Sequence, residues 1–399
     1  MNERDDTSRK ADGRLASIDA FRGLDMFFIM GFSGLVSAVA WCFSSLEYAS
    51  FVRTNAVALQ MRHVAWNGLH LYDMIFPTFI FIAGISFPFS YARQVARGDS
   101  PLSVHLRLVK RMLLLVALGI VYNGFFKLDF PLRYGSVLGK IGIAWFVAAL
   151  AYVHFGLKAR IGLCAALLVG YCLSMHLFVA PDAPAGADGF SRLGCLSGWL
   201  ERVAMPGKLH GGNFDGAGWF VDIMAASSAM LGMFAGDLLR SPRFSGARKT
   251  LLMLVGAAAL IALGLAATPV CPIVKKTWTP TFALVCGGAD LAVLAALYWI
   301  MDVKGWRAWA FPLRVIGLNA ITVYLLQKVV DVGAIARFFV GTSPCIQRHV
   351  VDSKDLVSRG LCGLCASPAL SLAIYWFAYV LVCWLVLYFL YRKNVYLKV

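Results

Sequence analysis

Charged residues are scarce in this chain: 15% of its 399 residues are Asp, Glu, Lys or Arg, and 21 acidic residues stand against 37 basic ones. A soluble domain carries about 25% charged residues. Hydrophobic residues make up 60% of the chain, and no segment has the composition of a soluble domain. The shortage of charge therefore excludes an ordinary soluble protein. It predicts an all-α, polytopic integral membrane protein whose first partner is the lipid bilayer.

Sequence motifs of common soluble enzymes are also missing. The chain has no P-loop, no GxGxxG after a strand, no HExxH and no GxSxG, which argues against the corresponding nucleotide, zinc and serine chemistries. Its seven histidines are scattered, so we expect no metal. The net charge of +16 is spread over short segments between apolar runs rather than gathered in one patch, which argues against a nucleic-acid partner.

Cysteines do not form a recognisable redox motif. Cys362 and Cys365 have CxxC spacing, but no second CxxC and no βαβ pattern accompany them, which argues against a thioredoxin-like role. If the connecting segments face an oxidising compartment, structural disulfides are the better interpretation of their cysteines, with the pairing left open. These cysteines are Cys195, Cys271, Cys345, Cys362 and Cys365.

A helix needs about 20 mostly apolar residues to cross a bilayer. By this criterion we expect about ten transmembrane helices. They cover Ile18–Phe43, Leu69–Tyr91, Met112–Phe126, Ser136–His154, Ile161–Ala180, Trp219–Leu239, Leu251–Thr268, Thr279–Met301, Phe311–Phe339 and Ala369–Tyr391.

The basic residues predict how the chain lies in the membrane. Lys and Arg are concentrated in alternate connections, for example in 93–111 and 240–249, and in both terminal segments. Because basic segments stay on the cytoplasmic side, both termini should be cytoplasmic. Residues 1–14 are expected to form a disordered cytoplasmic tail, and residues 15–399 a single transmembrane domain. His63 then lies on the exterior side.

The segment around His63 carries the strongest chemical signal. His63, Trp66, Asn67 and Asp73 precede the apolar run that begins near Phe79. His can give or take a proton near neutral pH, and placing a carboxylate at the edge of the hydrocarbon costs free energy. A helix cap with an interfacial Trp belt and a catalytic cluster remain alternative interpretations.

Three other polar positions also have two interpretations. Arg22 lies between Asp19 and Asp25, so it forms a local ion-pair anchor or helps to bind an anionic cofactor. Asp215 precedes a helix and either caps it or contacts substrate. Lys276-Thr-Trp278 suits an interfacial anchor or a substrate site.

Several of these segments together resemble one family, the heparan-α-glucosaminide N-acetyltransferases, and especially its bacterial members linked to N-acetylglucosamine use. The match runs from Arg14 through nearly the whole chain. Its motifs are Ser17-Ile-Asp-Ala-Phe-Arg22-Gly23, His63-x-x-Trp66-Asn67-Gly68, Asp73-x-x-Phe76-Pro77-x-Phe79-x-Phe81-x-x-Gly84, Asn213-Phe-Asp215, Lys276-Thr-Trp278-Thr-Pro280 and Gly317-x-Asn319-Ala320-x-x-x-Tyr324.

The resemblance implies a multi-pass acyltransferase of a bacterial inner membrane. Acetyl-CoA would enter from the cytoplasm, and the acceptor would be the amine of a glucosamine-type amino sugar or oligosaccharide outside. The family's essential His falls on His63. Ser33 stands where the lysosomal enzyme has Asn, and Gln327 stands where it has His. A homodimer is one assembly to consider.

Acetyl transfer to an amine needs a base and donors to the oxyanion. We assign His63 as base or acetyl carrier, Asp73 as its orienting group, and Asn67 and Ser33 as donors. Arg22, Asn319 and Gln327 are assigned to the cofactor, and Trp66, Asp215, Lys276 and Trp278 to the acceptor.

An amino-sugar transporter is the alternative function, although no inverted repeat is evident in the sequence. A structural membrane protein, the third class, would not need His63.

Overall fold

The computed structural model describes residues 15–124, 131–341 and 367–397. Within these ranges the chain is helical, and its β-structure is limited to two isolated bridges, Asn67 with Val274 and Arg133 with Gly207. The all-α class is therefore confirmed. The predicted tail, residues 1–14, lies outside the described residues, as do Cys345, Cys362 and Cys365. Cys195 and Cys271 are free thiols in the structure.

Eight described helices are long and apolar enough to cross a membrane, or nine if one bent pair is counted as a span. The expected span 112–126 corresponds to α7 (Pro101–Tyr122), which is not one of these eight. Its 22 residues include three charged ones, Arg107, Lys110 and Arg111, so it is not apolar enough to meet the same criterion. The eight are α2–η1–α3 (Ala16–Cys42), α6 (Ile75–Ala96), α8 (Val137–His154), α9 (Leu157–Leu177), α11 (Trp219–Arg240), α12 (Gly246–Ala266), α13–η4 (Pro280–Val303) and α19 (Pro368–Arg392).

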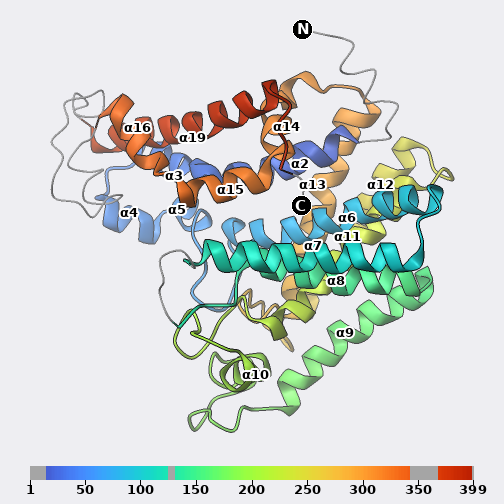
Figure 1. The fold of residues 1–399 in the computed structure, drawn as a ribbon. Coiled ribbons are helices and arrows are strands. Elements are labelled where there is room, and N and C mark those ends of the chain that lie inside the picture. Colours follow the sequence, from blue (N-terminus) through green and yellow to red (C-terminus); the bar gives the residue numbers. More distant parts are fainter. Residues whose placement is uncertain (1–14, 125–130, 342–366, 398–399) are drawn as a thin grey trace.

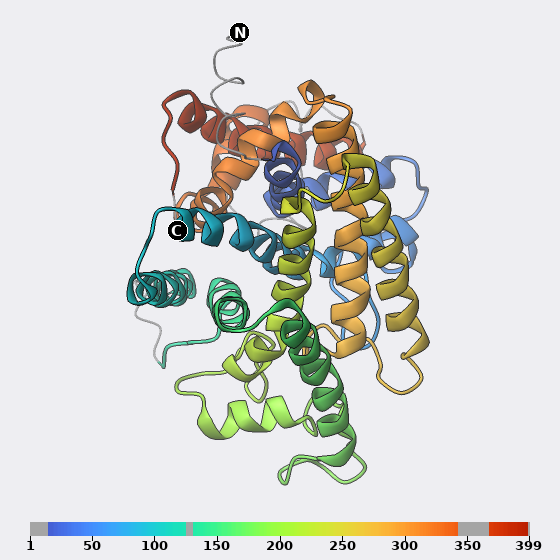
Figure 2. The ribbon, with the colours of Figure 1, turned by 90° about the vertical axis from the view of Figure 1, so that its right-hand side faces the viewer.

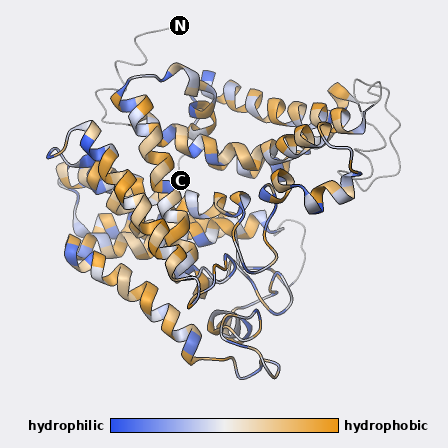
Figure 3. Cartoon of the chain, turned by 180° about the vertical axis from the view of Figure 1, so that it is seen from behind, coloured by the Kyte–Doolittle hydropathy of each residue, from blue (hydrophilic) through white to orange (hydrophobic). Residues whose placement is uncertain are grey.

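The long helices pack in one bundle, with α6, α7 (Pro101–Tyr122), α8 and α11 side by side, and α2, α3, α15 and α19 beside them (Figure 1). Figure 2 shows α12 running alongside α13. The most apolar stretches of α11 and α13 are 67% and 61% buried, whereas those of α9 and α12 are 22% buried. Hydrophobic residues make up most of the length of these helices (Figure 3), and many of their large apolar residues are exposed. Such faces are stable against lipid rather than water.

Two predicted spans differ in the structure. The expected helix 69–91 begins only at Ile75, because residues 69–74 form a loop that contains the 3₁₀ turn η2 (Leu71–Asp73). The expected span 311–339 is three helices, and α14 and α15 meet at a 60° bend at Asn319. Its three parts are α14 (Phe311–Leu318), α15 (Ala320–Val329) and α16 (Val332–Val340).

Helices α2 and α14 cross at two glycines. A methyl group on Gly23 would collide with the backbone carbonyl of Leu313, and one on Gly317 would collide with the carbonyl of Asp19. The two backbones therefore touch directly, as small residues permit in membrane bundles. This crossing fixes one wall of the cavity described next, to which both Arg22 and Gly317 belong.

Candidate active site

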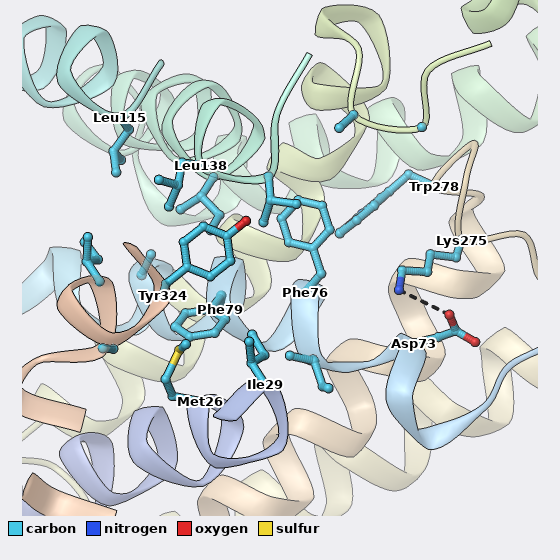
Figure 4. A pocket seen from close by; sticks show the side chains of 18 of the residues that line it. Met26, Ile29, Asp73, Phe76, Phe79, Leu115, Leu138, Lys275, Trp278 and Tyr324 are labelled. Atoms are coloured by element: carbon cyan, nitrogen blue, oxygen red, sulfur yellow. Dashed lines mark hydrogen bonds and ion pairs between the residues drawn. The ribbon is translucent and has the colours of Figure 1, made fainter. Parts of the chain in front are cut away.

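A cavity of about 980 Å³ runs through the bundle. Phe76, Phe79, Ala83 and Ser86 of α6 line it in succession, so it follows that helix for most of the distance from Ile75 to Ser86, roughly 16 Å at 1.5 Å per residue. Its middle is apolar, where Met26, Ile29, Phe79, Leu138 and Tyr324 converge (Figure 4). We call its two polar regions the histidine end (His63, Tyr72, Asp73 and Lys275) and the arginine end (Arg22, Ser86 and Arg111).

Three charged or titratable side chains meet at the histidine end. His63 Nδ1 lies 2.9 Å from Asp73 Oδ1. Lys275 Nζ donates to the same oxygen at 3.1 Å and lies 3.1 Å from His63 Nδ1. The Asp73 side chain is 1% exposed, whereas that of His63 is 57% exposed. The imidazole therefore faces the cavity while its carboxylate partner is held behind it.

Local backbone structure places Asp73. Its Oδ2 accepts hydrogen bonds from the backbone N–H groups of Val64 at 3.1 Å and His70 at 3.2 Å. The Gly68 N–H also bonds to the Ile273 carbonyl at 2.8 Å, which ties this loop to the segment before α13. Asp73 therefore caps the 3₁₀ turn η2 and not α6, whose N-cap is Met74 with no side-chain cap. The same carboxylate contacts His63.

A tight turn presents Lys275. The Trp278 N–H donates to the Lys275 carbonyl at 3.1 Å, and Thr279 Oγ1 accepts from the Val274 N–H at 3.0 Å. Trp278 has φ of 54°, an uncommon conformation for a bulky residue. Its ring is buried against Phe76 and Phe282, and its indole N–H donates to Ser228 Oγ at 3.2 Å. This packing holds the strained residue in place.

The charges at the histidine end shift each other's pKa values. Burial raises the pKa of the Asp73 carboxyl, but the hydrogen bond from His63, the charge of Lys275 and the two backbone N–H groups outweigh it and bring the pKa below its usual range. Burial lowers the pKa of Lys275, and the Asp73 carboxylate partly opposes this effect. Asp73 is therefore an ionised carboxylate across the physiological range.

Two aromatic residues assigned to the acceptor line the cavity near this end. The Trp66 indole N–H donates to the Phe190 carbonyl at 3.0 Å, and its ring packs edge-on against Phe214. Lys276 Nζ lies 5.7 Å from the centre of the Trp66 ring. Trp66, Lys276 and Trp278 are all lining residues. The structure thus brings three of the four residues assigned to the acceptor to one region.

Asp215, the fourth, also lines the cavity but is fully engaged. Arg133 donates to both of its oxygens at 2.7 Å, and the His210 and Ala217 N–H groups bind them as well. These bonds hold the pKa of the Asp215 carboxyl below its usual value despite burial. The cap interpretation is wrong here: α11 has Gly218 as its N-cap, with no side-chain cap. The carboxylate instead closes a turn that ends before that helix.

A second polar cluster, formed by Lys140, Asp222 and Glu201, lies next to the loop that carries Asp215. Lys140 of α8 is completely buried, donates to the Gly216 carbonyl at 2.7 Å, and lies 3.8 Å from Asp222 Oδ1 and 4.8 Å from the centre of the Trp278 ring. Glu201 of α10 (Leu196–Ala204) accepts the Asp215 N–H at 3.0 Å. Burial raises the pKa of Glu201 to about 8. This cluster supports the loop that carries Asp215.

At the arginine end, Arg22 donates to Ser86 Oγ at 3.2 Å and pairs with Asp19 at 3.4 Å. The guanidinium of Arg111 lies 4.2 Å from the centre of the Trp145 ring. Within the described part of the chain, Arg111 Nε is buried and has no hydrogen-bond partner. Asp25, the other carboxylate considered for Arg22, has one buried oxygen without a partner among the same residues.

Four sequence-predicted residues lie beside the cavity rather than on its surface. Asn319 binds the C-terminal segment, donating to the Val395 carbonyl at 3.1 Å and accepting the Leu397 N–H at 3.3 Å. Gln327 accepts the Tyr379 hydroxyl at 3.3 Å. Ser33 Oγ donates to the Phe28 carbonyl at 3.5 Å. Asn67 is exposed and pairs through its backbone with Val274.

Sequence reasoning missed three lining residues, Lys275, Arg133 and Arg111. Lys275 directly precedes the assigned Lys276, so the motif was recognised but its contact with His63 was not. Arg111 begins an apolar run and was counted only as a topology signal. Arg133 comes from a polar connection with no motif. Among the described residues, no three His, Cys, Asp or Glu side chains converge as a metal-binding group.

No protein-family model matches the chain. Similar curated proteins include the heparan-α-glucosaminide N-acetyltransferases of Mus musculus, 25% identical over 82% of this chain, and Homo sapiens, 26% identical over 80%. The chain spans about half the length of these relatives, 55% and 53% respectively. It is therefore a multi-pass membrane protein that is distantly homologous to a transmembrane N-acetyltransferase.

Proposed function

We propose that this protein is an acetyltransferase that moves an acetyl group from acetyl-CoA to the amine of a glucosamine-type amino sugar through its central cavity. The observation that carries the proposal is the contact of His63 with Asp73 and Lys275 in the cavity whose other end holds Arg22 and Arg111. The distant homology to N-acetyltransferases supports the same chemistry.

The arginine end fits the anionic part of acetyl-CoA. Arg22 and Arg111 both line the cavity, and the buried Nε of Arg111 has no hydrogen-bond partner among the described residues. A guanidinium offers several donors to phosphate oxygens. The apolar middle of the cavity separates this end from His63, so the acetyl-bearing arm would extend past Phe79 toward the histidine end.

The histidine end fits the acceptor and the transfer step. Because Nδ1 of His63 faces Asp73, Nε2 is the nitrogen left for substrate. In direct transfer, His63 takes a proton from the acceptor ammonium, the amine attacks the thioester carbonyl, the C–S bond breaks, and the CoA thiolate takes up a proton. In the alternative, Nε2 carries the acetyl group before the amine receives it. Trp66 provides an aromatic surface for the sugar, and the buried Trp278 supports Phe76 from behind.

We propose that the histidine end opens outside the cell and the arginine end toward the cytoplasm of a bacterial inner membrane, with both chain termini cytoplasmic. The Lys and Arg asymmetry of the connections supports this orientation. Single cysteines introduced within 93–111 should react with a membrane-impermeant reagent only from the cytoplasmic side. Single cysteines introduced within 190–210 should react only from outside, and the reverse pattern would refute the two-sided scheme.

Reconstituted vesicles test the function. Vesicles loaded with [¹⁴C]acetyl-CoA and supplied externally with glucosamine should release labelled N-acetylglucosamine, whereas vesicles with the His63→Ala protein should not. The transporter alternative predicts uptake of unmodified glucosamine, because a cavity with polar groups at both ends suits passage as well. Uptake without labelled product would replace the acetyltransferase with the transporter.

A further inference from the structure

Lys275 contacts both members of the His63–Asp73 pair. The Asp73 carboxylate also binds His63 and two backbone N–H groups, and Lys275 Nζ lies 3.1 Å from both Asp73 Oδ1 and His63 Nδ1 (Figure 4 shows its bond to Asp73). An ammonium group next to an imidazole disfavours a second positive charge there. The position of Lys275 therefore bears on the protonation state of His63.

We propose that Lys275 is a positioning residue that keeps His63 neutral, with its Nδ1–H directed at Asp73 and its Nε2 free to accept a proton or an acetyl group. This inference rests on the proposed function for its consequence, but the protonation of His63 can be measured without acetyl transfer. Asp73 alone would favour an imidazolium, whose Nε2 cannot act as base or nucleophile. Lys275 opposes that effect by sharing the same carboxylate oxygen.

The turn that carries Lys275 makes this arrangement specific. Lys276, one residue on, points to the Trp66 ring instead, so the two neighbouring lysines face different partners. The Trp278 N–H bond to the Lys275 carbonyl and the positive φ of Trp278 fix the direction of the turn. The Lys275 side chain is 20% exposed, which limits the screening of its charge by water.

Other charged or titratable groups surround the pair, and their effects must be separated from that of Lys275. The Tyr72 ring contacts the His63 ring at a tilt of 45° with ring centres 4.8 Å apart, and His70 binds the Arg62 carbonyl within the same loop. Lys276 carries a like charge next to Lys275. Cys286 of α13 is also close enough to interact with Lys275. Among the described residues, only Asp73 and Lys275 make direct polar contact with the His63 ring.

Diethyl pyrocarbonate, which modifies neutral imidazole, provides the test. The fraction of His63 modified at each pH, measured by peptide mass spectrometry on the full-length protein, gives a midpoint. In Lys275→Met this midpoint should move up by at least about one pH unit, because the nearest positive charge is lost while Asp73 remains. Lys275→Arg should keep the wild-type midpoint. Lys158→Met, at an exposed site in α9, is the matched control and should leave the midpoint unchanged.

A second measurement covers the case in which Lys275→Met does not fold. Acetylation of Lys275 in the folded wild-type protein removes its charge, whereas amidination keeps it, and only acetylation should raise the midpoint. At pH values well below both midpoints, acetyl transfer by Lys275→Met should be about tenfold lower than in wild type for every pH unit by which the midpoint rises, and it should recover in more alkaline buffer. An equal loss at every pH with an unmoved midpoint would show a merely structural role and overturn the inference. A raised midpoint after acetylation of a wild-type protein with no transferase activity would retain the inference and reject the proposed function.

Discussion

The two ends of the cavity differ in how their charges are satisfied. At the histidine end, Asp73 has a cation, an imidazole and two backbone N–H groups around it, and the neighbouring Asp215 is bound on both oxygens by Arg133. At the arginine end, Arg111 packs on the Trp145 ring and takes part in no ion pair within the described residues. Under the proposed function, the first arrangement would be preorganised for acetyl transfer, and the second would offer positive charge to the anionic part of acetyl-CoA.

Removing His63 should have the largest effect of those predicted. His63→Gln should lower acetyl transfer by roughly 10²–10⁴-fold, the range for a lost general base, while acetyl-CoA binding stays within about twofold of wild type. Rates in vesicles and binding by calorimetry check this. His70→Gln, in the same loop but outside the cavity lining, is the control. A fully active His63→Gln protein would return this end of the cavity to a purely structural role.

The next prediction compares two aspartates that each form a bidentate ion pair with an arginine. Asp215 is buried and bound by Arg133, whereas the Asp182 side chain is 48% exposed and bound by Arg202. Asp215→Asn should lower the free energy of unfolding by about 3 kcal/mol, because it strands a poorly exposed guanidinium. Asp182→Asn should lower it less, because water already screens the Asp182 carboxylate and Arg202 keeps its hydrogen bonds to the Leu193 and Asn213 carbonyls. Denaturation in detergent measures both, and equal losses would mean that burial does not set the difference.

The arginine end should respond in affinity rather than in stability. Arg111→Gln should weaken acetyl-CoA binding by about tenfold, the effect of losing one charge-assisted hydrogen bond, and should reduce the salt dependence of binding. Arg248→Gln, at an exposed position of α12, is the matched control. Arg22→Gln carries an additional folding risk because Asp19 would lose its partner. Unchanged affinity in a folded Arg111→Gln protein would place the cofactor phosphates elsewhere.

The last prediction concerns a gradual change of stability with pH. Glu201 has a pKa of about 8 in the folded protein, above its value of 4.5 in the unfolded chain, so the folded state binds more protons between these pH values. Stability should therefore fall as pH rises from about 4.5 to about 8, by at most about 1.4 kcal/mol per pH unit. Glu201→Gln should flatten this decline, as melting temperatures at several pH values would show. An identical pH dependence in the variant would assign the decline to other groups.

The sequence predicted the membrane class and most helix positions, because lipid requires long apolar runs that are visible in one dimension. It also singled out His63 and Asp73, which lie ten residues apart on one loop. It could not predict Lys275, since the contact with His63 spans 212 positions and depends on the turn at Trp278. It did not predict the bend at Asn319 within 311–339, where the Asn319 side chain binds the distant backbone of Val395 and Leu397.

The same limit applies to the function of individual polar residues. Asn319 and Gln327 have residue types that suit a cofactor site, but in the structure their amides bind the C-terminal segment and Tyr379. The sequence does not show which group a side-chain amide binds in the folded protein. Arginines were likewise counted as orientation signals, although Arg111 faces the cavity. Side-chain direction, rather than composition, separates these roles.

The crossing of α2 and α14 has a mechanical consequence. Because Gly23 and Gly317 leave no gap between the backbones, neither helix can slide or tilt without forcing a carbonyl of the other out of the way. Arg22 and Gly317, which both line the cavity, therefore keep a fixed spacing. A ligand must fit this rigid wall as built rather than widen the cavity by parting these two helices.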